Sequence, residues 1–255
     1  MSQRIARPEL PLDGILVLDF SQFLAGPVSA MRLADLGARV IKIERPGTGD
    51  IGRTLAFAGI ASDGDTLSFH IMNRNKESFA ADLKNESDKK DVIELIKKAD
   101  VIIQNFRPGV MERLGFGYEA VKAINPKIIY ASATGYGEKG PWKDRPGQDL
   151  LAQSITGFPW LNGSKDEPPI PVGIAIADIL TSIHIAHGVT ALLLRRERTG
   201  VGGIVDTSLV ESMLDLQFEL LSAHAFDDQL RVNRGPRNAA HAFLPAPYGI
   251  YPTSD

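Results

Sequence analysis

The sequence contains no cysteine, which excludes a disulfide scaffold, a thiolate nucleophile and any zinc or iron–sulfur site built on cysteine. A strong charge is also missing, since 28 basic and 31 acidic residues give a net charge of −3. Nucleic-acid-binding domains are usually strongly basic, so no nucleic-acid partner is expected. No window reaches about 18 apolar residues, and residues 1–8 lack the apolar core of a signal peptide. We therefore predict a cytoplasmic protein with no membrane partner.

What is present is a globular composition with an alternating pattern of strands and helices. Of the 255 residues, 44% are hydrophobic and 23% are charged. The expected strands lie at 15–20, 40–44, 78–83, 101–105, 128–132 and 204–207, and the expected helices at 28–36, 91–98, 111–114, 118–124, 149–154, 179–196 and 209–223. This alternation predicts an α/β fold with a mostly parallel sheet.

Glycines and prolines gather between residues 137 and 172 and predict a long loop region around the helix at 149–154. Loops of this length are usually functional or disordered. From residue 227 onward the chain is polar and then rich in proline, and residues 251–255 are expected to form a strand that runs into a turn. This ending indicates that the chain stops short of a complete protein.

Several common site types lack their signature. The unit at 15–44 places Glu44 where a dinucleotide site would hold the ribose, but its turn contains only Gly26 and no G-x-G-x-x-G, which disfavours that site. His184 and His187 lie three residues apart on a helix, yet no third ligand accompanies them, so we predict no metal site. The absence of a G-x-S-x-G motif disfavours a serine hydrolase.

Carboxylates remain as candidates for catalysis. Asp178 precedes the helix expected at 179–196, which makes it an N-cap residue and also a carboxylate that the helix dipole keeps anionic. The two interpretations are compatible, because an anionic carboxylate suits a nucleophile. Gln148 and Asp149 open the helix in the loop region, where Asp149 also fits simple stabilisation of the first turn.

Three basic residues, Arg45, Lys84 and Arg113, fall near strand ends or helix starts. Each is a candidate contact to a phosphate group, and each also fits a solvated surface charge.

A series of short blocks carries a resemblance to a known family. The blocks are Pro11–Phe20, Ala25–Pro27, Leu36–Pro46, Gly49–Asp50, Asn73–Lys76, Ala99–Val101, Asn105–Gly109, Gly135–Gly137, Gly140–Pro141, Asp178 and Arg198–Gly200. Together they resemble the class III coenzyme A transferases (CaiB/BaiF), the family of formyl-CoA transferase, carnitine CoA-transferase and α-methylacyl-CoA racemase. Because the blocks keep the family order, the resemblance covers nearly the whole chain.

The resemblance implies a Rossmann-like large domain, the start of a smaller second domain, and an interlocked homodimer for the full-length protein. It assigns residues 1–225 to the large CoA-binding domain and residues 226–255 to a linker and the beginning of the small domain. Since members of the family are longer, the chain resembles their N-terminal part.

The resemblance also implies the chemistry. Asp178 matches the catalytic aspartate, which attacks an acyl-CoA thioester and forms a mixed anhydride and then an aspartyl-CoA thioester. The acceptor acid attacks that thioester, with Gln148 and Asp149 nearby. Acyl-CoA and a carboxylic acid are therefore the expected substrates, and no permanently bound cofactor is expected.

The CoA contacts follow by the same matching. Phe23, Leu24 and Ala25 match the loop beside the thioester end, and the residues that match contacts to the nucleotide or the pantetheine are Arg45, Lys84, Asn105, Phe106 and Arg113. The cations suit phosphates, and Phe106 suits an apolar part of the ligand.

One departure bears on the reaction. The racemases of the family carry a histidine before the acidic residue in the loop that precedes the catalytic aspartate, and here that pair is Gln148 and Asp149. Because one proton-abstracting base is missing, CoA transfer is favoured over racemisation. An acyl-CoA racemase or isomerase, and a non-catalytic CoA-binding module, remain as alternatives.

Overall fold

The computed structural model describes residues 10–55, 59–230, 234–236 and 239–255, so residues 1–8, with their predicted lack of a signal peptide, lie outside it. The chain forms two compact units. The first contains the described residues up to Thr134 together with Thr181–Thr207, and the second contains Gly135–Leu180 and Ser208–Asp255. The boundary predicted between residues 225 and 226 is a different division and stays a prediction.

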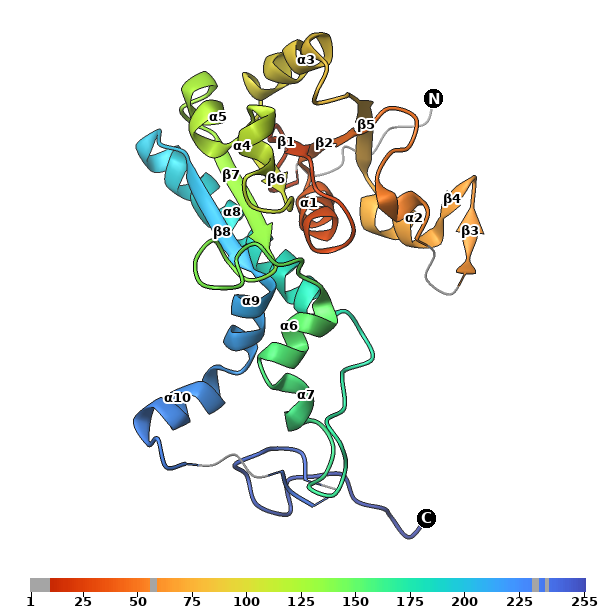
Figure 1. The fold of residues 1–255 in the computed structure, drawn as a ribbon, viewed down its shortest axis with the longest axis vertical. Helices are drawn as coiled ribbons and strands as arrows, with labels where there is room; N and C mark the ends of the chain where they lie inside the picture. The colour runs from red at the N-terminus through yellow and green to blue at the C-terminus, as the bar shows by residue number, and fades with distance from the viewer. Residues whose placement is uncertain (1–9, 56–58, 231–233, 237–238) are drawn as a thin grey trace, which may run out of the picture. The chain divides into compact units, whose positions relative to one another are not determined.

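The first unit is built on a six-stranded sheet (Figure 1). Its strands are β1 (Leu16–Asp19), β2 (Arg39–Glu44), β5 (Lys76–Ala80), β6 (Val101–Gln104), β7 (Ile129–Thr134) and β8 (Gly203–Ser208). They lie in the order β5-β2-β1-β6-β7-β8, and the pairs from β5 to β7 are parallel. Strands β3 (Ala61–Ser62) and β4 (Asp65–Thr66) form a separate antiparallel pair. With that pair set aside, the order is that of a Rossmann fold, which confirms the predicted α/β class.

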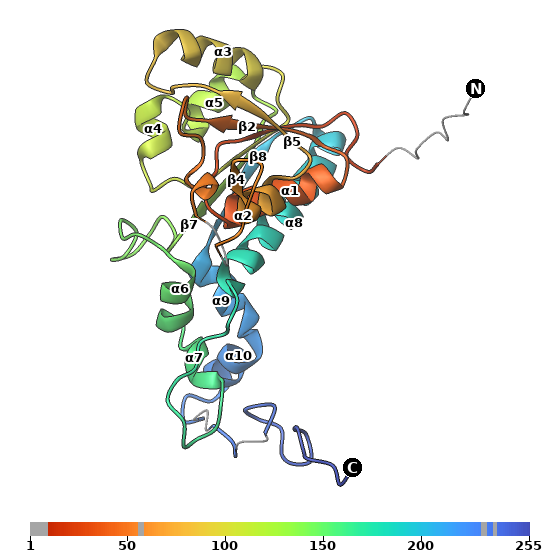
Figure 2. The same cartoon turned by 90° about the vertical axis from the view of Figure 1, so that its right-hand side faces the viewer.

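Helices cover both faces of this sheet (Figures 1 and 2). Helix α1 (Ala25–Asp35) and the part of α8 (Ile176–Thr199) that belongs to the first unit pack on one face. The helices α3 (Glu86–Ile96), α4 (Val110–Leu114) and α5 (Tyr118–Ile124) pack on the other. Side chains of successive strand residues point to opposite faces of the sheet. Val17 therefore packs in the core beside α1 and α8, and Leu18 packs in the core on the opposite face. Burial on both faces explains why the central strands β1 and β6 are continuous apolar runs in the sequence.

By length and composition alone, α8 is apolar enough to cross a membrane. Its residues Ile185, Val189 and Leu193 are nevertheless buried in the core on the α1 face of the sheet. This packing buries one side of the helix, whereas Ile183 and Leu194 on it are 42% and 55% exposed.

Local signals set the ends of several helices. The Asn85 side chain caps α3 by accepting hydrogen bonds from the backbone of Ser87 and Asp88, and Thr66 caps α2 (Leu67–Asn73) in the same way. Asp50 caps the short 3₁₀ helix η1 (Ile51–Arg53) through Gly52 N–H. After α1, Gly37 adopts a φ of +107°, a conformation that favours glycine.

The regular elements described in the second unit are helices joined by long irregular segments. The unit contains α6 (Asp149–Ile155), α7 (Phe158–Leu161), α9 (Leu209–Leu216) and α10 (Phe218–Phe226), and α6 packs on both α7 and α9. The single helix predicted at 209–223 is wrong, because the chain leaves helical geometry at Gln217 between α9 and α10. The strand predicted at 251–255 is also wrong, since those residues form no regular element.

Candidate functional site

In the first unit, the predicted CoA contacts follow the carboxyl ends of parallel strands. Phe23, Leu24 and Ala25 come after β1, Arg45 after β2, Lys84 after β5, and Asn105 and Phe106 after β6. Parallel strands end at one edge of their sheet, and ligands of open α/β folds bind at that edge where the strand order reverses. Here the reversal lies between β1 and β6. Arg113 lies on α4, the first helix after β6, and its guanidinium lies against Gly109.

Asn105 joins the two segments at this reversal point. Its side-chain oxygen accepts a hydrogen bond from Gln22 N–H at 2.8 Å, and its amide donates to the Gln22 carbonyl at 2.7 Å. The loop after β1 is therefore tied to the end of β6. A close approach completes the arrangement, because a Cβ added at Gly26 would lie 2.2 Å from Cβ of Ser21.

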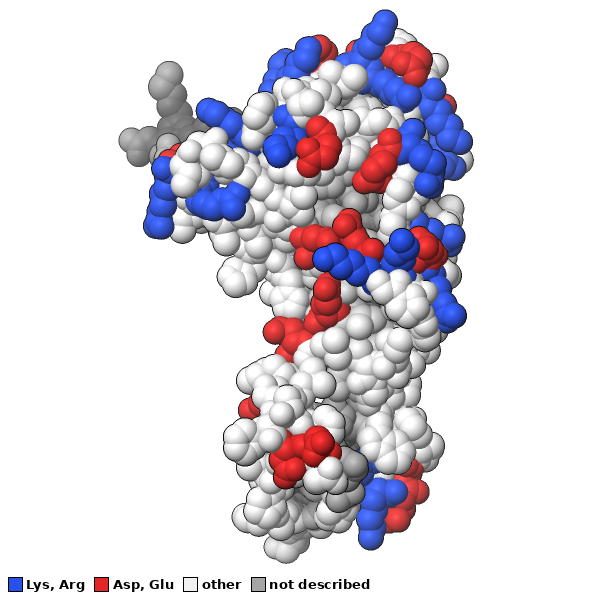
Figure 3. All heavy atoms as spheres, turned by 60° about the vertical axis from the view of Figure 1, so that its left-hand side comes forward, with Lys and Arg blue, Asp and Glu red and all other residues white. Residues whose placement is uncertain are grey.

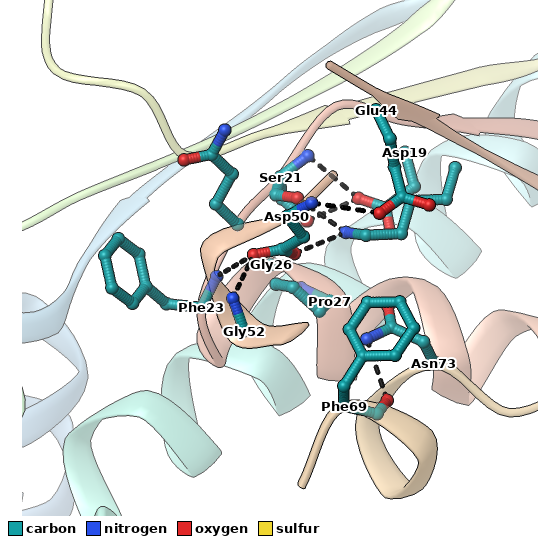
Figure 4. A network of polar contacts seen from close by, with 12 residues as sticks. Asp19, Ser21, Phe23, Gly26, Pro27, Glu44, Asp50, Gly52, Phe69 and Asn73 are labelled. Carbon is teal, nitrogen blue, oxygen red and sulfur yellow. Dashed lines mark hydrogen bonds and ion pairs between the residues drawn. The ribbon is translucent and has the colours of Figure 1, made fainter. Parts of the chain in front are cut away.

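Phe23 has an unusual backbone for its residue type. Its φ is +66°, in the left-handed region that residues other than glycine and asparagine rarely adopt. The residue is 51% exposed. Strained residues of this kind persist where their surroundings hold them, and they gather at ligand sites. Figure 4 shows the ring pointing away from the polar groups behind it, so the aromatic face is available to a ligand.

Those polar groups belong to a buried ionic network in which Lys42 pairs with two carboxylates, Asp19 and Asp50. Figure 4 shows the carboxylates of Asp19 and Asp50 beside Ser21. Lys42 Nζ lies 2.8 Å from Asp50 Oδ2 and 3.7 Å from Asp19 Oδ2, and it donates to the Ser21 carbonyl at 2.8 Å. Asp50 Oδ1 accepts from Gly52 N–H at 2.8 Å and from Phe23 N–H at 3.4 Å. The network thus reaches the strained loop at both Ser21 and Phe23.

Lys76 is a second buried cation in this network. Its Nζ donates to Asp19 Oδ2, to the Pro27 carbonyl and to Asn73 Oδ1, each at 2.8 Å. The contact to Pro27 ties the network to α1 as well.

Charge pairing decides the ionisation of these groups. Burial alone would raise the pKa of Asp19, but Lys42 and Lys76 outweigh it and lower the pKa to about 2. Burial lowers the pKa of Lys42, yet Asp19 and Asp50 hold that pKa above its usual value. For Lys76 burial prevails over Asp19, and its pKa falls to about 8. At neutral pH the network therefore carries charges of both signs.

Glu44, considered above for a ribose, is engaged by protein groups. Its carboxylate accepts hydrogen bonds from Arg53 Nε at 2.9 Å and Nη2 at 2.7 Å, from Ser78 Oγ at 2.6 Å and from Asp50 N–H at 3.0 Å. Burial raises its pKa, but the hydrogen bonds from Arg53 and Ser78 outweigh burial and lower the pKa to about 2. This environment gives Glu44 a structural role in holding the segment at Asp50.

In the second unit, Asp178 lies in the first turn of α8, which begins at Ile176. The prediction that Asp178 is the N-cap residue is therefore wrong. The residue before the helix is Ala175, whose methyl group cannot accept a hydrogen bond. Asp149 supplies the acceptor instead, because its Oδ1 lies 2.7 Å from Ala177 N and 3.2 Å from Asp178 N. The structure thus brings Asp149 and Asp178 together.

Gln148 lies at the exposed N-cap position of α6, and its side chain makes no capping hydrogen bond there. The entry into α6 is fixed by a close backbone approach, since a Cβ added at Gly135 would lie 2.4 Å from Cα of Gly147. Only glycines fit this crossing, which places the first residue of α6, Asp149.

Several residues that position Asp178 and the loop after β1 were not among the predicted site residues. Lys42 interrupts the apolar run of β2, and a buried charge needs partners, so it was a usable signal. The Gly49–Asp50 and Asn73–Lys76 blocks entered only as family markers. Gln153, which contacts Asp149, carried no pattern of its own, because a single glutamine on a helix is uninformative.

Comparison of the sequence with known proteins identifies the family of this chain. The sequence matches the family model of CoA-transferase family III over residues 12–255. The chain belongs to CoA-transferase family III. It is 39% identical, over 98% of its length, to the acetyl-CoA:oxalate CoA-transferase of Acetobacter aceti. It is 38% identical, over 96% of its length, to the succinate–glutarate CoA-transferase of Agrobacterium fabrum.

The family III assignment agrees with the fold. The crystal structure of a CaiB/BaiF family protein from Brucella suis matches with a TM-score of 0.85 and 36% identity, covering 94% of this chain and 63% of that one. The two curated relatives are matched over 63% and 61% of their own lengths. The family III chain therefore spans about three fifths of the relatives that it matches.

Proposed function

We propose that the whole protein transfers CoA from an acyl-CoA thioester to a free carboxylic acid through a covalent intermediate on Asp178. The observation that carries this proposal is the placement of Asp178 in the first turn of α8, with its own N–H bound by Asp149. A carboxylate at a helix N-terminus is stabilised as an anion by the helix dipole. Family III membership supports the reaction class.

The proposed reaction has four displacements. An Asp178 oxygen attacks the thioester carbonyl and CoA thiolate leaves, which gives a mixed anhydride; the thiolate then attacks the aspartyl carbonyl and releases the donor acid. The acceptor carboxylate attacks the resulting aspartyl-CoA thioester and expels the thiolate, which attacks the acceptor acyl group and frees Asp178. Each step conserves the thioester energy, so water must be excluded while the intermediates exist.

The first unit supplies groups suited to binding CoA. Arg45, Lys84 and Arg113 are exposed cations, and Phe23 offers an exposed ring while its backbone N–H donates to Asp50. We propose that these cations bind the phosphates and that the segment Phe23–Ala25 lies beside the thioester.

We further propose that one substrate is a dicarboxylic acid. The names of the relatives include oxalate, succinate, glutarate and mesaconate as partners of CoA transfer. A panel of these acids is therefore the first set to test as acceptors.

Trapping the intermediate tests the mechanism. The whole protein, incubated with acetyl-CoA or succinyl-CoA and then treated with hydroxylamine, is expected to carry a hydroxamate on Asp178, located by peptide mass spectrometry. An unmodified Asp178 alongside intact CoA binding would favour the binding-module alternative. Exchange of the substrate α-proton with deuterated solvent, without CoA transfer, would favour a racemase.

The second unit exposes an apolar surface that we propose is covered in a homodimer. Helix α10 contains no buried residue, and Phe218 and Phe226 are 62% and 96% exposed. On the face drawn in Figure 3, charged side chains are denser over the first unit, and on the second unit a few charged clusters interrupt an otherwise uncharged surface. Exposed apolar patches of this kind mark interaction surfaces. Light scattering of the whole protein should give the mass of two chains, and a single-chain mass would contradict the proposal.

A further inference from the structure

Gln153 connects the residue that caps α8 with the segment that leads into α8. It lies one turn after Asp149 on α6, and its side chain is 1% exposed. Its Nε2 donates to Asp149 Oδ2 at 2.6 Å, and its Oε1 accepts from Val172 N–H at 3.2 Å. The carboxamide thus uses its donor toward the carboxylate and its acceptor toward the backbone, which fixes its orientation.

Asp149 is thereby held at both oxygens. Oδ1 accepts from the first turn of α8 and Oδ2 accepts from Gln153. Without Gln153, the Asp149 side chain could rotate away from Ala177 and Asp178, and Val172 would lose its acceptor. The backbone that carries Asp178 would then be constrained less on two sides.

We propose that Gln153 is a positioning residue of the transfer reaction, acting through Asp149 to fix the backbone at Asp178. This inference rests on the proposed role of Asp178 as nucleophile. The cap itself contributes about 1 kcal/mol to helix stability. Nucleophilic attack depends far more steeply on position, since a displacement of about 1 Å can lower a rate about a hundredfold. The main effect of Gln153 is therefore expected on kcat.

The decisive variant is Gln153→Glu. A glutamic acid has nearly the shape of glutamine, but it donates to Asp149 only while it is protonated. Once ionised, it places two carboxylates at hydrogen-bonding distance and repels Asp149. We expect kcat near the wild-type value at low pH and a fall of about tenfold or more as the introduced carboxyl ionises, with KM for acyl-CoA nearly unchanged.

Other titratable groups near α6 are shared by wild type and variant. Asp149 begins α6 and contacts the first turn of α8, which carries Asp178. Glu211 and Asp215 lie on α9, which packs against α6. Helix α7 and residues 171–175 carry no titratable side chain. A pH step that appears only in the variant therefore belongs to the introduced carboxyl and its coupling to Asp149.

A matched control is Gln217→Glu. Gln217 is a buried glutamine of the same unit, 7% exposed, whose amide donates to the Met213 carbonyl one turn earlier at 3.0 Å. This variant should lose thermal stability as pH rises, yet keep the wild-type kcat profile. The pH profile of kcat thus separates positioning from a purely structural effect, and Gln153→Leu, which cannot donate at any pH, should be slow throughout.

The outcomes distinguish the two hypotheses. Hydroxylamine labelling of Asp178 in the wild type would support Asp178 as the nucleophile. If folded Gln153→Glu and Gln153→Leu nevertheless keep the wild-type kcat at every pH, the positioning role of Gln153 is overturned while the role of Asp178 remains supported. If wild-type Asp178 is never labelled during turnover, the proposed function itself fails. Thermal unfolding with bound CoA reports the folded fraction at each pH.

Discussion

Replacement of Asp178 by asparagine in the whole protein should lower kcat for CoA transfer at least about a thousandfold. Asparagine keeps the shape and the position in the first turn of α8, but its neutral carboxamide cannot displace a thiolate. Binding of CoA should stay within about twofold, because the cations proposed to hold it lie in the first unit. Stopped-flow or discontinuous assays of CoA transfer between acids measure the first quantity, and calorimetry with CoA measures the second.

Asp166→Asn is the matched control for this variant. Asp166 is an exposed acid of the same unit that is not part of α8, so its replacement makes the same change in charge at another position. Its kcat should equal that of the wild type. Transfer by Asp178→Asn at a near wild-type rate would contradict covalent catalysis by Asp178, whatever the control shows.

Replacement of Lys42 by methionine should destabilise the first unit by about 3–5 kcal/mol at pH 7. Methionine fills the same volume, but Asp50 loses its ion pair and Asp19 keeps only Lys76. A buried carboxylate without its partner is the costly state, and whole domains are stable by only about 5–15 kcal/mol. Urea unfolding followed by circular dichroism measures the loss.

Two further variants test the cause. Arg39→Met removes a cation from the same strand, but the Arg39–Glu77 pair is exposed, with side chains 63% and 56% accessible, so the loss should be below about 1 kcal/mol. The double variant Lys42→Met/Asp50→Asn should be more stable than Lys42→Met alone, since the unpaired charge is gone. Equal losses for Lys42→Met and Arg39→Met would show that burial of the network is energetically unimportant.

The effect of Lys42→Met should also depend on pH. The folded pKa of Asp19 is lowered from 3.8 to about 2, so its ionised form stabilises the fold above pH 3.8 and this contribution disappears as pH falls toward 2. For Asp19 alone the contribution is about 2 kcal/mol. In Lys42→Met the lowering is smaller, so the difference in stability from the wild type should narrow as the solution becomes acidic.

The central strands β1, β6 and β7 were predictable from sequence because both of their faces are buried, which leaves continuous apolar runs. Strand β5 is an instructive exception, predicted at 78–83 and observed at Lys76–Ala80. The start of β5 is set by its pairing with β2, which aligns Lys76 with Val40. The hydrogen bond from Lys76 Nζ to Asp19 also fixes this position. Neither contact is visible in a local window.

The prediction of the N-cap residue of α8 failed for a similar reason. Local rules look for a capping side chain just before a helix, and Asp178 was the available candidate. The actual cap comes from Asp149, which is 28 residues away from Ala177 in the chain. Gln153 was missed because its contact with Val172 comes from outside α6, and the partners of Lys42, Asp19 and Asp50, lie on other segments of the chain.

The division of the chain into two interrupted units has a consequence for synthesis on the ribosome. The core on the α1 face needs Ile185, Val189 and Leu193 of α8, which follow strand β7 only after the 46 residues Gly135–Leu180. At the usual elongation rates this insertion takes roughly 2–9 seconds, during which one face of the nascent sheet stays uncovered. Nascent chains arrested near residue 134 should therefore recruit chaperones, and chains long enough to expose α8 beyond the exit tunnel should release them.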